Sequence, residues 1–252
     1  MTGGKDGKAP ARRTGGPTHP PRDCGGPHGW ERKKAVGGLS MYELKRDIPY
    51  VDLTGQAVCP EALPGDWNRA NWADVSNYPW DESGYTPEAH AAASAWAGGL
   101  CVMMLAREET ISGTVREVGG GVCVDSCLEC FVQPFPDDPR YFNIEVNCLG
   151  TAHIAIGEGR EGRRVWKQLP EGARVSASAH ADGWWAMSAY LPASLLAECF
   201  SGRTLEPGAP LKGNFYKCDE TIHPHFGTWN PVVAPQPDFH RPECFGDMRV
   251  ER

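Results

Sequence analysis

Residues 141–147 read Tyr141-Phe142-Asn143-Ile144-Glu145-Val146-Asn147. Apolar and polar side chains alternate strictly here, which is the period of a β-strand with one buried face. We expect the central apolar side chains to face the core and Asn143 and Glu145 to face the other way. Gly150 ends the segment, and residues 152–156 are its expected partner strand. This region therefore predicts antiparallel β-structure.

The same pattern of short apolar or alternating segments extends along most of the chain. Residues 122–132 are predicted to form one long strand, with Glu129 on the face opposite Cys130. Further segments are a buried strand at 100–105, a hairpin of 174–179 with 184–191 across Asp182-Gly183, and one helix at 192–200. Roughly ten short strands and one minor helix predict an all-β fold, a two-sheet antiparallel β-sandwich or jelly roll.

Residues 1–40 differ in composition from the rest of the chain. They hold eight Lys or Arg, three acids, ten Gly and five Pro, and almost no periodic apolar signal. Such a segment cannot bury enough apolar surface to offset the entropy of ordering, so we expect a disordered basic tail. Residues 41–252 form the expected folded domain. Their net charge is −12, because the whole chain carries −7 and the tail +5. An acidic body disfavours nucleic acid as a partner.

No stretch of the sequence approaches the ~18 apolar residues of a membrane span, and residues 1–38 contain no apolar run of the signal-peptide type. We therefore expect no membrane partner and a cytoplasmic location. The chain has ten cysteines, several of them inside apolar segments. In a reducing compartment these are expected to be buried free thiols.

Four segments carry a resemblance to a known family. In chain order they are Asp125-Ser126-Cys127-Leu128-Glu129-Cys130-Phe131, residues 141–151, residues 213–218 followed by Trp229-Asn230-Pro231, and Pro237-Asp238-Phe239-His240-Arg241-Pro242-Glu243-Cys244-Phe245-Gly246. Together they resemble the family 9 carbohydrate-binding modules, especially the stand-alone branch called family 9-like. The resemblance runs from about residue 67 to the end. It implies a β-sandwich, sugar binding, often a bound calcium ion, and partnership with glycoside hydrolases.

The chemistry of sugar recognition selects candidate residues. A pyranose has a flat apolar face and an equator of hydroxyl groups, so it is bound by an aromatic ring and by polar side chains at its edge. We predict that Trp229 stacks on the sugar and that Asn230, Glu129, Asn143 and Glu145 hydrogen-bond the hydroxyls of a mono- or oligosaccharide.

The sequence departs from the family pattern at one position. The resemblance implies a clamp of two tryptophans, one of them just before the Asp-Ser strand. Residues 121–124 occupy that place and contain no aromatic side chain. Trp229 matches the other member of the pair, and Trp80, Trp166 or Trp184 are candidates to replace the missing ring.

Metal binding is a further possibility with weaker support. Asp137 and Asp138, in a turn, are conceivable ligands for the calcium that the resemblance implies. A zinc site could be imagined from Cys218, His223, His225, His240 and Cys244. Their spacing fits no standard zinc motif, and Cys127 and Cys130 would point to opposite faces of a strand. We therefore predict no zinc site from the sequence.

The three alternatives to sugar binding are a nucleotide site, a glycoside hydrolase and an interaction module. Residues 157–162 match the dinucleotide fingerprint, but no amphipathic helix follows, so a glycine-rich loop between strands is favoured. A glycoside hydrolase would need two carboxylates in one cleft, and the sequence alone selects no such pair. The third alternative is a structural or interaction module whose sugar site has decayed.

Overall fold

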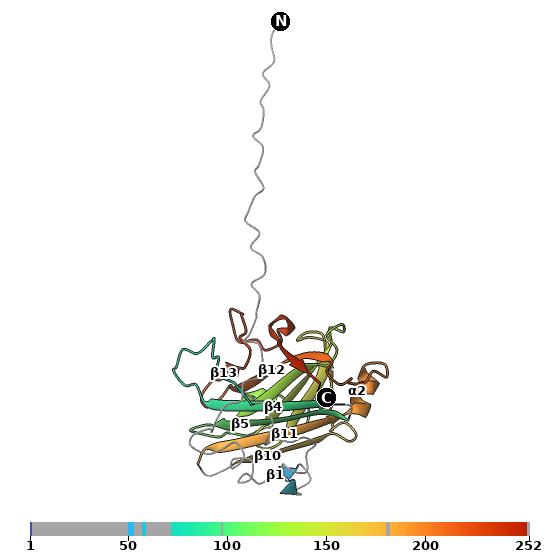
Figure 1. Cartoon of the computed structure of the whole chain (residues 1–252). Helices are drawn as coiled ribbons and strands as arrows, with labels where there is room; N and C mark the ends of the chain where they lie inside the picture. Colours follow the sequence, from blue (N-terminus) through green and yellow to red (C-terminus); the bar gives the residue numbers. More distant parts are fainter. Residues whose placement is uncertain (2–49, 53–56, 59–71, 97, 180–181, 251–252) are drawn as a thin grey trace.

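The computed structural model describes residues 1, 50–52, 57–58, 72–96, 98–179 and 182–250. Within these ranges the chain forms two antiparallel sheets packed face to face. Figure 1 shows β4, β5, β11 and β10 side by side in one layer, with β12 and β13 above them. The predicted all-β two-sheet sandwich is confirmed. The predicted disordered tail, residues 1–40, lies outside the described residues apart from Met1.

The first sheet has the strand order β2-β1-β10-β11-β5-β4-β3. Its strands in this order are Ala57–Val58, Tyr50–Asp52, Arg174–Ala179, Trp184–Pro192, Gly99–Arg107, Glu88–Trp96 and Ala73–Asp74. The expected hairpin is present, since Val175 pairs with Ala189 and Ala179 with Trp185 in antiparallel register. The turn residue Gly183 has a φ of +89°, a conformation that glycine adopts without strain.

The second sheet has the strand order β13-β12-β6-β7-β8-β9, and β14 also pairs with β12. The strands in this order, with β14 last, are His225–Thr228, Pro210–Asp219, Cys127–Gln133, Tyr141–Asn147, Ala152–Gly157, Arg164–Val165 and Gly246–Arg249. Glu129 of β6 lies directly opposite Glu145 of β7, and Cys127 lies opposite Cys218 of β12. This register places several polar side chains in adjacent rows on one face.

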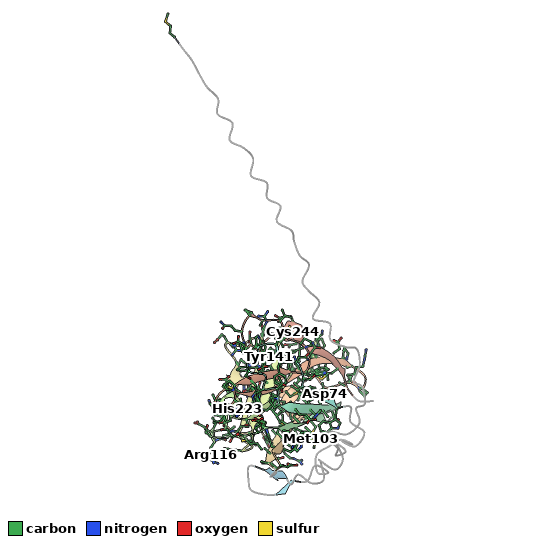
Figure 2. All side chains as sticks on the ribbon, turned by 90° about the vertical axis from the view of Figure 1, so that its left-hand side faces the viewer. Asp74, Met103, Arg116, Tyr141, His223 and Cys244 are labelled. Carbon is green, nitrogen blue, oxygen red and sulfur yellow. The ribbon has the colours of Figure 1, made fainter. Side chains whose placement is uncertain are left out.

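The main core lies between the two sheets. It combines Met104 and Trp185 from the first sheet with Cys130 and Ile144 from the second. A second cluster covers the outer face of the second sheet and includes Phe131, Tyr141, Tyr216, Phe239, Cys244 and Phe245. Tyr141 and Cys244, labelled in Figure 2, mark the side of this outer cluster, and Met103 of β5 marks the opposite side of the molecule.

The long strand predicted over residues 122–132 is only partly correct. Val122–Val124 forms a short 3₁₀ helix, and β6 begins at Cys127. The cause is Asp125, whose carboxylate accepts the backbone N–H groups of Thr114 (2.9 Å) and Val115 (2.9 Å). Asp125 therefore fixes a loop crossing where apolar periodicity alone predicts continued strand.

The other predicted elements are present, whereas β4 and β12 are strands that the sequence did not predict. The helix predicted at 192–200 is α2, Ala193–Cys199, which begins after Pro192. It is the only α-helix in the ranges that the structure describes. Pro242–Cys244 adds a second short 3₁₀ helix. None of the helices in the described part of the chain combines the length and apolarity that crossing a bilayer requires.

Candidate functional site

A pocket opens on the outer face of the second sheet. Its floor is formed by side chains of β6, β7 and β12, and its walls by β13 and the loop around residues 237–240. The residues that line it are Cys123, Glu129, Phe131, Glu145, Arg160, Cys218, Glu220, Phe226, Pro237, Asp238, Phe239 and His240. The hollow is small, about 80 Å³. Polar groups at the floor and phenyl rings at the walls give it the mixed character of a small-molecule site.

Glu129 and Glu145 are the two acids at the floor. They face each other across β6 and β7 and are only 2% and 8% exposed. Burial raises the pKa of both carboxyl groups, and repulsion from Glu145 raises the pKa of Glu129 further. The pair therefore holds a proton at pH values where ordinary glutamates are ionised. One carboxyl group can then donate a hydrogen bond while the other accepts one.

Asn143 orients the Glu145 carboxylate. Its Nδ2 donates to Glu145 Oε1 at 2.7 Å, and its Oδ1 accepts Nε (3.0 Å) and Nη2 (2.8 Å) of Arg163. The Arg163 guanidinium also lies 4.2 Å from the centroid of the Tyr141 ring. Asn143 is buried and does not line the pocket. Its position is therefore that of a support for Glu145.

Aromatic rings form the walls. Phe226 and Phe239 line the pocket with their ring centroids 6.2 Å apart. Trp80 lies behind them, with centroid distances of 6.4 Å to Phe226 and 6.1 Å to Phe239. At the rim, Arg160 Nη2 lies 2.7 Å from Asp238 Oδ1. Both apolar C–H faces and hydroxyl groups of a ligand would find partners here.

Trp229 and Asn230 are not brought to this pocket. The Trp229 ring packs 5.5 Å from the Phe215 ring, which belongs to the core between the sheets, and a Cβ on Gly246 would come within 2.6 Å of its Cη2. Asn230 is 3% exposed, and its Nδ2 donates to the carbonyl of Cys244 at 2.9 Å. Of the five predicted residues, only Glu129 and Glu145 line the pocket.

The three rings considered as replacements for the missing tryptophan lie in different places. Trp80 adjoins the pocket wall, as described above. Trp166 packs on Phe142 of the main core, with centroids 6.1 Å apart. Trp184 is buried in the first sheet beside His90. Of the three, only Trp80 packs against rings that line the pocket.

The conceivable calcium ligands do not fit calcium. Asp138 forms an ion pair with Arg140 (Oδ2 to Nη2, 2.6 Å), and Asp137 forms one with Arg203 (Oδ1 to Nη2, 2.8 Å). These carboxylates already have cationic partners, so no set of hard oxygen ligands is left between them.

No histidine of the imagined zinc set belongs to a group of three ligand atoms within coordination reach in the described part of the chain. Among the described residues, the one group with three ligand atoms within coordination reach is Cys127, Glu129 and Cys218. Cys130, the other half of the Cys-x2-Cys pair, lies in the core on the opposite face of β6. Residues 157–162 join β8 to β9, which agrees with a loop between strands rather than a dinucleotide site.

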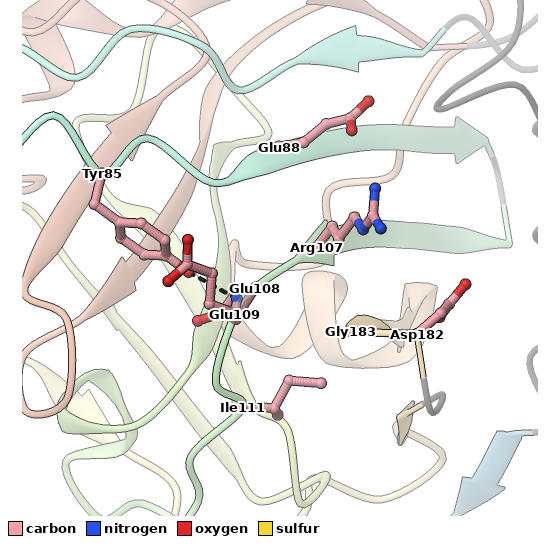
Figure 3. Close-up of a pocket in the computed structure, with 8 residues that line it drawn as sticks. All are labelled: Tyr85, Glu88, Arg107, Glu108, Glu109, Ile111, Asp182 and Gly183. Atoms are coloured by element: carbon pink, nitrogen blue, oxygen red, sulfur yellow. Dashed lines mark hydrogen bonds between the residues drawn. The ribbon is translucent and has the colours of Figure 1, made fainter.

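A second, larger hollow of about 670 Å³ lies at the end of β5, drawn in Figure 3. Figure 3 shows Glu88, Arg107 and Asp182 on one side and Tyr85 with Glu109 on the other. The carboxylate of Glu108 is occupied, since it accepts Trp185 Nε1 (2.5 Å), Ser126 Oγ (3.0 Å) and Lys217 Nζ (3.1 Å). This hollow is poorly suited to a sugar, because it is lined by four acids and one arginine and has no pair of facing aromatic rings.

Several pocket residues are not among the sugar-binding residues predicted from the sequence. Phe226, Phe239, Arg160 and His240 reach the pocket from loops and a short strand, where no periodicity marks their direction. The one signal was the Pro-Asp-Phe-His segment from residue 237, which carried part of the family resemblance. His240 Nδ1 lies 2.7 Å from the Tyr141 hydroxyl, which fixes its ring against the second sheet.

Comparisons with known proteins agree with this fold. A family model described as "Carbohydrate-binding family 9" matches residues 58–250. A structure of a candidate carbohydrate-binding protein from Bacteroides uniformis has a TM-score of 0.65 and 28% sequence identity, over 73% of this chain and 88% of that one.

Two more distant structures show the same fold. They are of a carbohydrate-binding module family 9 from Caldicellulosiruptor kristjanssonii, in complex with cellotriose (TM-score 0.51) and with glucose (TM-score 0.50). Each is 12% identical over 73% of this chain, and covers 84% and 86% of the module respectively. No curated protein sequence matches the chain.

Proposed function

This chain belongs to carbohydrate-binding family 9, and from that membership we propose that the pocket floored by Glu129 and Glu145 binds the end of a mono- or oligosaccharide. The observation that carries this proposal is the pairing of two buried acids with phenyl walls in one hollow on the outer face of the second sheet. Glucose and cellotriose are the first ligands to test, because distant members of the fold were solved with them.

Each group has a defined part in the proposed binding. Glu129 and Glu145 hydrogen-bond hydroxyl groups, each as a donor when protonated and as an acceptor when ionised. The walls, Phe226 and Phe239, contact the C–H face of the sugar. Asn143 acts through Glu145. Trp229 packs on the core between the sheets, and Asn230 ties its loop to Cys244. A partner glycoside hydrolase, implied by the resemblance, remains part of this proposal.

The affinity of such a site is modest. A single sugar buries little area, and association costs several kcal/mol of lost freedom, so we expect a Kd on the order of micromolar to millimolar. Intrinsic tryptophan fluorescence is the measurement of choice, because Trp80 packs against both ring walls and would report their occupation.

We predict that Glu145→Gln and Phe226→Ala each weaken sugar binding by roughly 10–100-fold, the range expected for a lost hydrogen bond to a charged group or a lost ring contact. Fluorescence titration with a panel of mono- and disaccharides measures this. Glu198→Gln on α2, a 58% exposed side chain away from the pocket, is the matched control and should bind normally. Undiminished binding by both pocket variants would remove the assignment of this site.

An absence of any fluorescence change when the wild-type protein is titrated with the sugar panel would have a different meaning. If the protein also melts cooperatively, the fold is intact and the panel is not bound. That result would favour the alternative of an interaction module with a decayed sugar site. It would overturn the proposed ligand class without affecting the family membership.

A further inference from the structure

Two thiols and a carboxyl group converge beneath the pocket. Cys127 of β6 and Cys218 of β12 lie directly opposite each other, and Glu129 is two residues further along β6 on the same face. The Cys218 thiol donates to Glu129 Oε1 at 3.1 Å. One ligand atom from each of the three side chains lies within 4.8 Å of the others, and all three residues are buried.

These separations suit a tetrahedral metal ion. Zinc binds thiolate sulfur at about 2.3 Å and carboxylate oxygen at about 2.0–2.2 Å, which places its ligand atoms roughly 3.5–3.8 Å apart. Small side-chain rotations would therefore bring the three atoms into coordination. Two thiolates make the site soft, so it favours zinc over calcium, which prefers oxygen ligands.

The charges around the cluster favour a cation. Glu129 and Glu145 are buried next to each other, and Glu220 also lines the pocket. The nearby Lys217 side chain lies on the other face of β12 and pairs with Glu108. Arg160 at the rim is paired with Asp238. His153 and Arg163 act electrostatically on Glu145, so a divalent ion at the floor would chiefly offset the charge of Glu129.

We propose that Cys127, Cys218 and Glu129 bind a zinc ion at the floor of the pocket, with the fourth coordination position facing the hollow. Cys123, which lines the same hollow, stands on that side, and its carbonyl accepts the Cys218 thiol at 3.6 Å. Binding displaces two thiol protons and any proton held by Glu129. The site goes beyond sugar binding and does not depend on it.

The position of the two cysteines explains why spacing could not reveal the site. Cys127 and Cys218 are far apart in the sequence, and only the pairing of β6 with β12 brings them together. The nearer pair, Cys127 and Cys130, is separated by the sheet itself, because Cys130 points into the core between the sheets.

The test is the metal content of the full chain, purified in reductant and supplied with zinc. We expect one zinc per chain, and after replacement by cobalt a thiolate-to-cobalt absorption band in the near ultraviolet. Cys127→Ser and Cys218→Ser should each weaken zinc binding by more than about 10-fold, since even outer-shell partners contribute that much. The matched control is Cys199→Ser, a half-buried cysteine on α2, which should bind zinc normally.

X-ray absorption at the zinc edge of the wild-type protein supplies a second readout, which does not depend on the variants folding. Two sulfur ligands and lighter atoms are expected. Chains that contain no zinc while all thiols react as free, or a disulfide joining Cys127 to Cys218, would overturn the proposal. A cobalt band that persists in both cysteine variants would do the same. No sugar enters these measurements, so their failure is separate from that of the proposed sugar site.

Discussion

Glu129 lies in an environment unlike that of an ordinary surface acid. It is 2% exposed, lies opposite Glu145 and accepts a thiol hydrogen bond from Cys218. Glutamate in an unfolded chain titrates near pH 4.3, whereas burial and repulsion raise the pKa of Glu129 in the folded protein. Folding therefore takes up protons in the pH range between these two values.

The sign of the resulting pH dependence follows from linkage. Because the folded state binds more protons than the unfolded state, the contribution of Glu129 is present below about pH 4.3 and is lost as pH rises through the raised pKa. We predict that Glu129→Gln makes the decline in unfolding free energy shallower above pH 4.3. Urea denaturation across pH, with a chelator present, measures this. Parallel curves for variant and wild type would show that Glu129 titrates normally.

Two histidines act in the opposite direction and must be separated from this effect. Burial lowers the pKa of His225 and of His240 to about 3, with further lowering from Lys217 and Arg163 respectively. Their contribution to stability is present above about pH 6.5 and is lost as pH falls toward 3. The difference between Glu129→Gln and wild type cancels this contribution, because neither histidine pKa is set by Glu129.

At the scale of the elements, a buried ion pair joins the two sheets. Lys217 of β12 in the second sheet lies 3.1 Å from Glu108, just beyond β5 in the first, and both side chains are at most 1% exposed. Glu108 also accepts Trp185 Nε1 of β11 at 2.5 Å. The network therefore fixes the position of β12, which carries Cys218 into the pocket floor.

We predict that Lys217→Met lowers the free energy of unfolding by about 3–5 kcal/mol, because it leaves Glu108 buried without its cation. The double variant Lys217→Met with Glu108→Gln should recover part of that loss. Lys212→Met is the matched control on the same strand, since its partner Asp247 is 82% exposed, and its effect should stay within about 1 kcal/mol. Equal losses in the single and double variants, measured by urea denaturation, would argue against this account.

Alternation in β6 and β7 was enough to predict which of their side chains share the outer face. Glu129, Asn143 and Glu145 were placed there from period alone, and the register confirms the shared face. Trp229 was predicted from its residue type and motif. It lies in a loop without periodicity, so the sequence could not predict on which side of the sheet its ring would lie. The zinc ligands depend on strand order, which pairs β12 with β6 across a long stretch of intervening sequence. The local sequence pattern predicts which face of a strand a side chain takes, but it does not predict which strand lies next to it.

At the scale of the whole molecule, the residues required for the β-sandwich to fold can be bounded from the sequence and the fold. The family match covers residues 58–250, and the first described strand, β1, begins at Tyr50. Residues 1–40 hold ten glycines and five prolines, a composition that buries little apolar surface. The sandwich is therefore proposed to fold from residues 41–252 without contributions from the segment before them.

We predict that deleting residues 1–40 leaves the melting temperature and the sugar response unchanged. Deleting residues 1–60 should lower the melting temperature, because it also removes β1 and β2 and exposes the edge of β10 that β1 covers. Thermal melts followed by near-ultraviolet circular dichroism compare the two truncations. For a domain of this size, 1 kcal/mol corresponds to a shift of roughly 2–4 °C, so a larger fall on removing residues 1–40 would assign that segment a part in the fold. Equal melting temperatures for both truncations would instead show that β1 contributes nothing to the stability of the first sheet.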